Sequence, residues 1–325
     1  MSPMSDTQIL IEIARLYYDE DLTQQQIAKR MNMSRSLVSK LLGKAKKIGI
    51  VEVIVHSEIS HPYKEIEDRL KQVLGLNYVK VTDSEIGQQY NNIHRETSRY
   101  LTMCLADCRT VVVSASKTIR SVAEQLSSTL TFPDVTFVPA SGGLAELRWE
   151  NNANMNCSVF AQKSGAKSQQ LYAPIVVDTK ETKDVLCAQP FIRNVLKNGR
   201  NADLALVGIG GSFQTFELEE AYLKELNINY TVDESLVQGD VSFNYFDKNG
   251  ELIDCKWNNL LMGLSLDDFR KIPEVLCVAS EADKAESIYV AAEKKLITSL
   301  ITNVNVAKRI LHYYSRDLYH SHDRK

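Results

Sequence analysis

The sequence predicts an α/β protein with an N-terminal helix-turn-helix domain, followed by a larger domain built on a doubly wound, mostly parallel sheet. Two observations favour this fold class. Three amphipathic helical patterns with short connections occupy residues 8–48. From residue 78 onward, near-continuous apolar segments alternate with amphipathic ones, as expected for strands covered on both faces by helices. We place the two domains at residues 1–56 and 57–325.

The composition is that of an ordinary globular protein. Of the 325 residues, 44% are hydrophobic and 24% are charged, and the formal net charge is −3. The N-terminus lacks the charged and apolar regions of a signal peptide, and no apolar run approaches the roughly 18 residues of a membrane-spanning helix. We therefore expect a cytoplasmic protein without a membrane partner.

Neither a metal site nor a catalytic motif is evident. The six cysteines form no CxxC pair and no zinc-like cluster with histidine, so we expect reduced, buried thiols. The GxSxG, HExxH, Walker and full GxGxxG motifs are missing, and no acid–base pair can be nominated. We assign no catalytic residue, metal or cofactor. The cysteines are residues 104, 108, 157, 187, 255 and 277.

The first domain begins with a helix predicted over residues 8–18, which has apolar residues on one face. Thr23 and Gln26 have the spacing of a capping box, which predicts a short helix over 24–31. The tight turn that follows contains Asn32, a residue type that tolerates positive φ.

Ser34 can cap the next helix, predicted over residues 35–48, and Gly49 can end it. Alternating valines over residues 51–55 then favour a wing strand. The inner faces of the two later helices are expected to contain Ile27, Ala28, Val38, Leu41, Leu42 and Ala45. This order of helix, short helix, tight turn and helix is the helix-turn-helix pattern.

A basic segment coincides with this pattern. Lys29 to Lys47 contains seven basic and no acidic residues, whereas the other 306 residues carry 31 Lys and Arg (38 less these seven) against 41 Asp and Glu. A basic island on an acidic protein favours binding to double-stranded operator DNA. The alternative, a helical bundle with solvated lysines, does not explain why the caps and turn occur together with this charge.

The second helix of such a motif lies in the major groove of DNA. Arg35, Ser36 and Ser39, with Leu37 nearby, are placed to read bases, since arginine can form a bidentate contact with guanine. Four other polar or basic side chains suit phosphate contacts, which position the protein without specifying sequence: Thr23, Gln24, Lys40 and Lys44. The residues that we assign to DNA binding are Thr23, Gln24, Ser34, Arg35, Ser36, Leu37, Ser39, Lys40 and Lys44.

The second domain is predicted to start with a helix over residues 63–76. Strands are expected over 109–115, 134–140, 202–211, 274–280 and 297–302, with helices over 119–130, 284–295 and 304–314. Residues 239–250 are expected to form a strand closed by an Asp-Lys-Asn-Gly turn. The tail, residues 320–325, is expected to be frayed.

Ligands of such sheets bind beyond the carboxyl ends of the strands. Ser116, Lys117 and Thr118 follow one strand and start a helix, where an anion is favoured. Glycine-containing loops at 139–143 and 208–211 permit close approach of a ligand to the backbone. Asp240 and Lys284 are further candidates for ligand binding, and Lys284 lies at another helix start. A small polar or anionic ligand is therefore expected at this edge.

The ordered set of motifs resembles the SorC family of bacterial transcriptional regulators over nearly the whole chain. The helix-turn-helix part of the resemblance is "LYYDEDLTQQQIAKRMNMSRSLVSKLLGKAKKIGIVEVIV". The rest is carried by "LYAPIVV" (171–177), "LVGIGG" (206–211), "GDVSFNYFDKNGELID" (239–254) and "GLSLDDFRKIPEVLCVASEADKAESI" (263–288). "FVPASGGLAE" (137–146) and "NNANMNC" (151–157) are similar to the branch that contains the central glycolytic gene regulators.

The resemblance implies a second domain folded like glucosamine-6-phosphate isomerases, a phosphorylated-sugar effector and a tetramer built from dimers. It places the family's phosphate loop on Ser116, Lys117 and Thr118. Together with the strand-end loops, it gives the effector-binding set Ser116, Lys117, Thr118, Ser141, Gly142, Gly143, Asn152, Gly208, Gly210, Asp240 and Lys284.

The chain departs from the family pattern at several of these positions. Ser141 stands where the glycolytic branch has an arginine, and Ser280-Glu281 replaces the usual Gly-Gly ahead of Lys284. The other departures are Ala115-Ser116 in place of Trp-Gly, an additional acid at Asp283, Thr302-Asn303 in place of Thr-Asp, and Leu37 in place of a commonly polar residue. A carboxylate beside Lys284 repels a phosphate dianion, whereas Leu37 suits a thymine methyl.

The sequence therefore predicts a transcriptional regulator of carbohydrate metabolism genes, not an enzyme, controlled by a small sugar or sugar-phosphate effector and acting as a dimer or tetramer. The alternatives are an effector-blind regulator with a degenerate pocket, or a sugar-phosphate isomerase or deaminase with a DNA-binding head. The sequence names neither the effector nor the operator.

Overall fold

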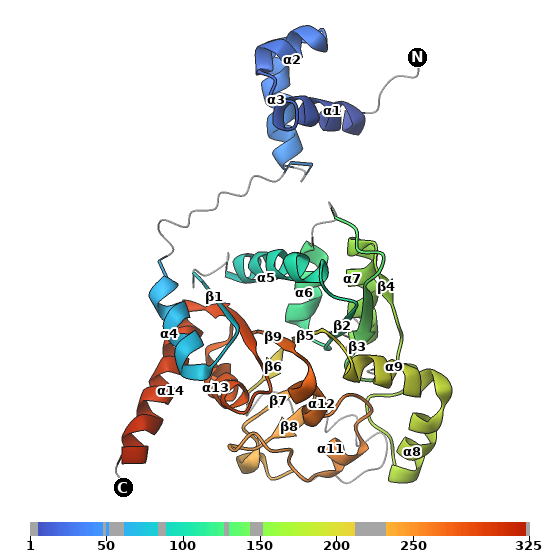
Figure 1. Cartoon of the computed structure of the whole chain (residues 1–325), viewed down its shortest axis with the longest axis vertical. Helices are drawn as coiled ribbons and strands as arrows, with labels where there is room; N and C mark the ends of the chain where they lie inside the picture. The colour runs from blue at the N-terminus through green and yellow to red at the C-terminus, as the bar shows by residue number, and fades with distance from the viewer. Residues whose placement is uncertain are drawn as a thin grey trace. The chain divides into compact units, whose positions relative to one another are not determined.

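The structure, a computed structural model, describes residues 6–47, 50–51, 62–83, 89–126, 130–143, 152–211 and 232–322 (Figure 1). The chain divides into two compact units, Met1–His61 and Pro62–Lys325. The domain boundary expected between residues 56 and 57 lies outside the described residues. So do Gly49 and nearly all of the wing strand expected over 51–55.

The first unit contains the three predicted helices, α1 (Asp6–Tyr18), α2 (Gln24–Arg30) and α3 (Arg35–Lys47). The predicted capping box forms at the start of α2. Thr23 Oγ1 accepts the Gln26 N–H at 3.3 Å, and Gln26 Oε1 accepts the Thr23 N–H at 2.9 Å. Asn32 has the expected positive φ of 51°. Ser34 Oγ accepts the Leu37 N–H at 3.2 Å, so Ser34 caps α3 as predicted.

The core of the first unit is the apolar side of these three helices. Ile13, Ile27, Val38 and Leu42 are buried together. Ala45 is also buried, and Leu41 packs partly buried against this core. The predicted inner faces are therefore confirmed, and the opposite face of α3 is left to solvent.

The second unit contains a seven-stranded, wholly parallel sheet in the order β1-β10-β9-β5-β2-β3-β4. Its strands are β1 (Tyr78–Thr82), β2 (Thr110–Val113), β3 (Thr136–Pro139), β4 (Lys167–Ser168), β5 (Leu204–Val207), β9 (Glu274–Val278) and β10 (Ser299–Asn303). The predicted strands are confirmed as β2, β3, β5, β9 and β10. β1 and β4 complete the two edges.

Helices cover both faces of this sheet, as Figure 1 shows. The helices described in this unit are α4 (Lys64–Leu74), α5 (Gln89–Leu105), α6 (Lys117–Gln125), α7 (Ala153–Ser164), α8 (Lys180–Ala188), α9 (Pro190–Arg200), α11 (Lys256–Leu260), α12 (Leu266–Lys271), α13 (Ala285–Glu293) and α14 (Val304–His322). Of these, α8 and α11 lie away from the sheet. Along β2, Val112 packs into the core beneath α13 and α14, whereas Val111 and Val113 pack into the core beneath α5 to α7. This alternation is that of a strand buried on both faces.

Two predicted strands are divided differently. The segment 202–211 breaks at Gly208, so that β6 (Ile209–Gly210) leaves the large sheet and pairs antiparallel with β7 (Gly239–Val241). β7 then pairs with β8 (Asn244–Phe246), so 239–250 is a hairpin rather than one strand. Ser242 and Phe243 have φ values of 49° and 66° and form its two-residue turn.

Two smaller predictions have different outcomes. The Asp-Lys-Asn-Gly turn forms as expected, with the Asn249 N–H donated to Asp247 Oδ1 at 2.8 Å. Residues 320–322 of the tail are helical rather than frayed, since α14 continues to His322, beyond the helix end predicted at residue 314, whereas residues 323–325 lie outside the described residues. Arg316, in that extension, lies 3.5 Å from Glu286 of α13 and over the ring of Tyr313, so packing and charge both favour the longer helix.

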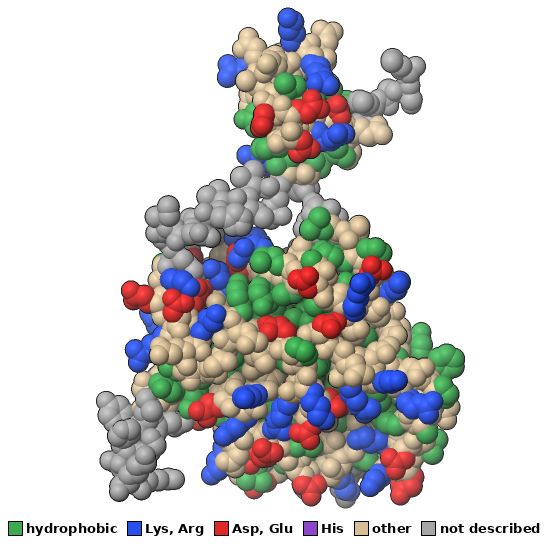
Figure 2. Space-filling view, viewed as in Figure 1, with side chains coloured by type: hydrophobic (Ala, Val, Ile, Leu, Met, Phe, Trp, Pro, Cys, Tyr) green, Lys and Arg blue, Asp and Glu red, His purple; other side chains and the backbone are tan. Residues whose placement is uncertain are grey.

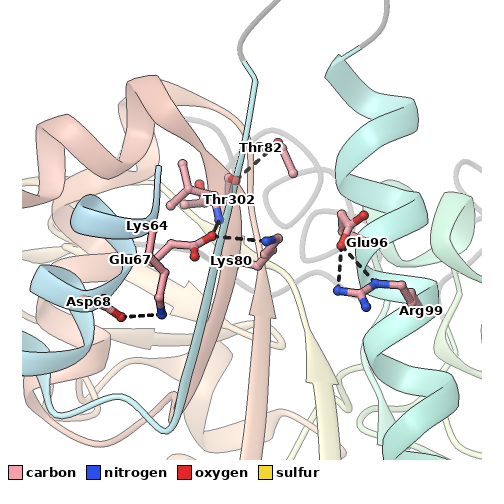
Figure 3. Close-up of polar contacts among 9 residues, drawn as sticks. Lys64, Glu67, Asp68, Lys80, Thr82, Glu96, Arg99 and Thr302 are labelled. Carbon is pink, nitrogen blue, oxygen red and sulfur yellow. Dashed lines mark hydrogen bonds and ion pairs between the residues drawn. The ribbon is translucent and has the colours of Figure 1, made fainter. Parts of the chain in front are cut away.

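The free side of β1 is closed by a side chain, as Figure 3 shows. Glu67 of α4 is buried and accepts the Val81 N–H at 2.7 Å, and Lys80 Nζ lies 3.7 Å from the same carboxylate oxygen. On the other side, β1 pairs with β10, and Thr82 donates to Thr302 O at 3.4 Å. Satisfying this outward N–H protects the strand from pairing with another chain.

The direction of the chain across the sheet reverses between β2 and β5. From β2 the chain proceeds through β3 to β4 at one edge, whereas from β5 it proceeds through β9 to β10 in the other direction. Connections therefore leave these two neighbouring strands toward opposite sides. Ligands of doubly wound sheets bind at such a switch point, at the carboxyl ends of the strands.

Gly142 gives a test of the packing at this end of the sheet. Its N–H donates to Met262 O at 2.7 Å, and a Cβ there would collide with Pro174 O. We predict that Gly142→Ala destabilises the second unit by about 1–3 kcal/mol, because backbone atoms have to move. Both tryptophans belong to this unit, so their fluorescence during urea unfolding measures the change.

The matched control is Gly43→Ala on α3, where an added Cβ meets no atom within 4 Å. It should not lower the urea midpoint reported by tryptophan fluorescence. An unchanged midpoint for Gly142→Ala would contradict the packing described here.

Candidate functional site

The exposed face of α3 carries the side chains expected to contact DNA. Arg35, Ser36, Ser39, Lys40 and Lys44 are all exposed. Leu37 is 42% exposed, which is unusual for a leucine next to a well-filled core. The structure therefore places the assigned residues of α3 on one accessible helix, in agreement with the prediction. Their contacts with DNA remain a prediction.

Arg35 lies at the wall of a hollow between the helix ends. The hollow is lined by the C-terminal end of α1, the loop before α2 and the start of α3; its lining residues are Tyr17, Tyr18, Asp21, Leu22, Thr23, Gln24, Gln25 and Arg35. Thr23 and Gln24, assigned to phosphate contacts, thus lie beside the arginine assigned to base reading. Arg35 forms no ion pair with any residue that the structure describes. In contrast, Arg30 is held by Glu20 at 2.9 Å.

In the second unit, the predicted loops meet at the switch point. The Gly208 N–H, after β5, donates to Ser114 Oγ, after β2, at 3.2 Å. A Cβ on Gly208 would stand 3.0 Å from Ser116 Oγ, so glycine permits the two loops to lie side by side. Ser116 caps α6 without a side-chain hydrogen bond to the helix, and Lys117 is exposed. Ser116, Lys117, Thr118 and Gly208 are therefore brought together.

Asp240 and Lys284 also lie near one another on this side of the sheet. Asp240 is paired with Gly210 in the small sheet, and a Cβ on the adjacent Gly211 would stand 3.6 Å from Lys284 Cγ. Lys284 Nζ is 3.2 Å from Glu281 Oε2. The carboxylate that the sequence places beside Lys284 thus forms an ion pair with it.

In the loop after β3, some backbone groups form hydrogen bonds with neighbouring segments of the chain and are therefore not available to a ligand. The Gly143 N–H donates to Ala173 O at 2.8 Å, and Gly142 is bound to Met262. Asn152 Oδ1 caps α7 by accepting the Asn154 N–H at 2.9 Å. Ser141 is fully buried, and its Oγ has no hydrogen-bond partner among the residues that the structure describes. The two glycine N–H groups are therefore occupied, whereas the Ser141 hydroxyl is free to bind.

Asn156 is a site residue that the sequence analysis missed. It is fully buried in the first turns of α7, and its Nδ2 donates to Ser114 O at 3.1 Å and to Ser116 O at 3.4 Å. Two carbonyl acceptors fix the orientation of the amide. Its Oδ1 has no partner among the described residues. The sequence offers one signal for it: Asn156 is a polar residue in a helical segment beside the apolar residues Cys157 and Phe160, which the structure buries.

The environment of Asp240 opposes ionisation. Burial raises the pKa of its carboxyl from 3.8 to about 6, against the opposing effects of the Phe243 N–H and the Lys284 ammonium. The Phe243 N–H donates to Oδ2 at 2.9 Å, whereas Oδ1 accepts no hydrogen bond from any described residue. At neutral pH, Asp240 is therefore a buried carboxylate with one unsatisfied oxygen.

Glu281 and His94 are the other two groups near the site whose pKa values are shifted. The charge of Lys284 and local hydrogen bonds outweigh the burial of Glu281 and lower the pKa of its carboxyl, so this group is ionised at neutral pH. His94 of α5 is buried, and burial lowers its pKa despite the nearby Glu281. His94 is therefore neutral at neutral pH and adds no positive charge.

The other chemical predictions concern metals, thiols and membranes. Three of the cysteines are buried and three are half-buried, and none is in a disulfide. Within the described ranges, no cluster of His, Cys, Asp and Glu is arranged to hold a metal ion. Across the same ranges, no helix is both long enough and apolar enough to span a membrane.

A helix-turn-helix unit joined to an α/β unit with loops gathered at a switch point defines a ligand-sensing transcriptional regulator. Comparison with known proteins gives the family. Residues 60–312 match the family model described as "Putative sugar-binding domain", and residues 12–47 match "Sigma-70, region 4". The chain belongs to this sugar-binding family, the SorC family of transcriptional regulators.

The relatives span both units. The "Deoxyribonucleoside regulator" of Bacillus subtilis is 27% identical over 315 residues, which cover 94% of this chain and 97% of that protein. The "Central glycolytic genes regulator" of the same organism is 26% identical over 262 residues, covering 76% and 75%. These relatives are named as regulators, not enzymes, in agreement with the prediction.

The fold is also that of a solved structure. The full-length sorbitol operon regulator SorC from Klebsiella pneumoniae superposes with a TM-score of 0.77 over 95% of this chain and 100% of that one, at 23% identity. This similarity confirms the two-part α/β fold that the sequence predicted.

The buried carboxylate of Asp240 predicts a dependence of stability on pH. Below about pH 3.8 the carboxyl is protonated in both the folded and the unfolded chain. As the pH rises from 3.8 to about 6, the carboxyl ionises in the unfolded chain before it ionises in the folded chain. The folded chain therefore loses up to about 3 kcal/mol of stability over this range, and the loss is complete above about pH 6. Asp240→Asn removes this cost and should raise the urea midpoint at pH 7.5, with a smaller difference near pH 4.

Tryptophan fluorescence during urea unfolding at the two pH values measures this difference. Asp184→Asn, on the exposed side of α8, is the matched control and should change neither midpoint. A destabilised Asp240→Asn variant at pH 7.5 would contradict the assignment of an unsatisfied buried carboxylate.

Proposed function

We propose that this protein is a cytoplasmic, DNA-binding regulator of carbohydrate metabolism genes, controlled by a small sugar or sugar-phosphate effector. The observation that carries the proposal is the meeting of the loops after β2 and β5, with the Gly208 N–H bound to Ser114 Oγ. The buried, unsatisfied oxygens of Asp240 in β7 and Asn156 in α7 lie on elements that contact these loops. Such groups are typical of a site that a polar ligand completes.

The effector-binding residues in this proposal are Ser116, Lys117, Thr118, Ser141, Gly142, Gly143, Asn152, Asn156, Gly208, Gly210, Asp240 and Lys284. Ser141, Asn156 and Asp240 supply buried polar oxygens. The loop glycines and Asn152 hold the backbone in place. These assignments extend the family membership to particular side chains.

The DNA-binding residues are those predicted on α2 and α3: Thr23, Gln24, Ser34, Arg35, Ser36, Leu37, Ser39, Lys40 and Lys44. Ser34 acts through the cap that positions α3, whereas Arg35 is accessible and without an ion pair within the described part of the chain. One such unit offers a small contact surface. A dimer or tetramer presents two units to half-sites about one helical turn, roughly 34 Å, apart.

Effector control requires two arrangements of this oligomer with different effector affinities. A change in the spacing of the two helix-turn-helix units is a sufficient switch. The effector-blind alternative requires that no ligand occupies the loops, and the buried unsatisfied oxygens count against it.

Arg35→Ala tests the base-reading role. We predict a loss of about 1–3 kcal/mol in operator affinity at one base position, because a bidentate contact is removed there. Fluorescence anisotropy with operator and with single-base variants measures the loss at fixed salt concentration. Arg15→Ala, on α1 and paired with Asp19, is the control and should not change base preference. Equal losses on operator and random DNA would contradict the assignment of Arg35.

Lys284→Ala tests the sensing role. The variant should retain operator affinity within about twofold and lose the effect of the effector on that affinity, because it removes the one cation facing Glu281 and Asp240 that the described residues provide. Anisotropy titrations with and without effector measure both quantities. Lys271→Ala, at the exposed end of α12, should respond like the wild type. A normal response of the Lys284 variant would exclude Lys284 from the site.

A further inference from the structure

The charge of the effector can be inferred from the ion pair at Lys284. This inference rests on the proposed function, since it concerns the ligand of the same site. Lys284 Nζ lies 3.2 Å from Glu281 Oε2, and the two side chains are 17% and 32% exposed. A partly buried lysine that already has a carboxylate partner offers little net attraction to a second anion. A phosphate would also approach Glu281 itself and be repelled.

Hydrogen bonds hold the Glu281 side chain in this position, in addition to its ion pair with Lys284. Its Oε2 also accepts the Ser280 N–H at 3.2 Å and the Ser280 hydroxyl at 3.3 Å. Asn303 Nδ2 donates to Ser280 O at 2.7 Å, which ties the loop to the end of β10. The carboxylate therefore does not turn away readily to admit a phosphate.

The unsatisfied groups nearby require hydrogen-bond donors. Asp240 Oδ1 and Asn156 Oδ1 are buried acceptors without partners in the described part of the chain. A buried acceptor left without a donor costs free energy, which a ligand hydroxyl recovers. Hydroxyl groups donate hydrogen bonds, whereas a phosphate dianion only accepts them. The Ser141 hydroxyl can serve such a ligand as donor or acceptor.

The nearby carboxylate of Asp283 adds to the repulsion of a phosphate. Asp283 is exposed, and its Oδ2 would lie 3.7 Å from a Cβ on Gly211, so it faces the same loop. Lys117 at the start of α6 is an opposing cation, but it is exposed and screened by solvent. The carboxylates of Asp240, Glu281 and Asp283 thus outnumber the lysines Lys117 and Lys284 in these loops.

We propose that the effector is an uncharged sugar or polyol, and that Lys284 and Glu281 together bind its hydroxyl groups rather than a phosphate. The ion pair acts as a selectivity element: the ammonium donates to ligand oxygens and the carboxylate accepts from ligand hydroxyls. The same carboxylate lowers the affinity for the phosphate ester of the same sugar.

Isothermal titration calorimetry of the full chain at pH 7.5 tests this proposal. The probes are glucose, fructose, ribose and sorbitol, each beside its terminal monophosphate ester. We expect at least one free compound to bind at least tenfold more tightly than its ester and to change operator affinity. In Glu281→Gln, the ratio of the two affinities should shift at least tenfold toward the ester, because the Lys284 ammonium loses its anionic partner.

Glu251→Gln is the matched control, because it removes an exposed carboxylate that pairs with Arg270 at 3.7 Å. It should leave the ratio unchanged, and melting temperatures verify that both variants fold. An ester that binds more tightly than its parent and releases the operator would overturn this inference while leaving the proposed function intact. An unchanged ratio in Glu281→Gln would also overturn it. Binding of none of the eight compounds, by protein that binds its operator, would count against both proposals.

Discussion

The reversal of chain direction between β2 and β5 is the constraint on which the second unit depends. Because connections leave these adjacent strands toward opposite sides, the backbone after each strand is free to form loops instead of packing against a crossing helix. The Gly208 N–H and Ser114 Oγ join the two loops across the gap. The glycine lets the two loops lie close together, since an added Cβ would stand 3.0 Å from Ser116 Oγ. In the proposed function, a ligand satisfies the polar groups that have no partner at this position.

At the proposed site, a buried polar group lowers the stability of the fold. A core of apolar strands and helices surrounds Asp240, whose buried carboxyl opposes folding at neutral pH. Other buried polar groups in this unit have partners: Glu67 accepts the Val81 N–H at the sheet edge, and Asn244 Nδ2 donates to three backbone carbonyls. Acidic and basic side chains are also interspersed over the face of this unit drawn in Figure 2. That face therefore has no single sign of charge, and in the proposed site selectivity is assigned to the local pair of Lys284 and Glu281.

Local chemistry explains which parts of the fold the sequence predicts well. The capping box at Thr23, the turn at Asn32 and the cap at Ser34 depend on neighbours within three residues, so helices α2 and α3 begin where predicted. The strands of the large sheet are apparent as apolar runs. The break at Gly208 and the hairpin at Ser242 and Phe243 are not apparent from the sequence. Gly208 lies against Ser116, which is distant in the sequence, and the hairpin turn has positive φ at two residues that are not glycine, one of them a phenylalanine. Asn156 was missed because its partners, Ser114 and Ser116, are about 40 residues away along the chain.

Hydrogen–deuterium exchange of the full chain, with and without a saturating sugar that alters operator affinity, tests the central claim most directly. The account predicts slower exchange in the peptides that contain residues 114–118, 208–211 and 239–243, because the ligand covers the loops of the switch point. The α8 peptide, residues 180–188, should exchange at the same rate in both samples. Protection confined to other surfaces, with no change in these three peptides, would contradict the claim that the effector binds at the switch point.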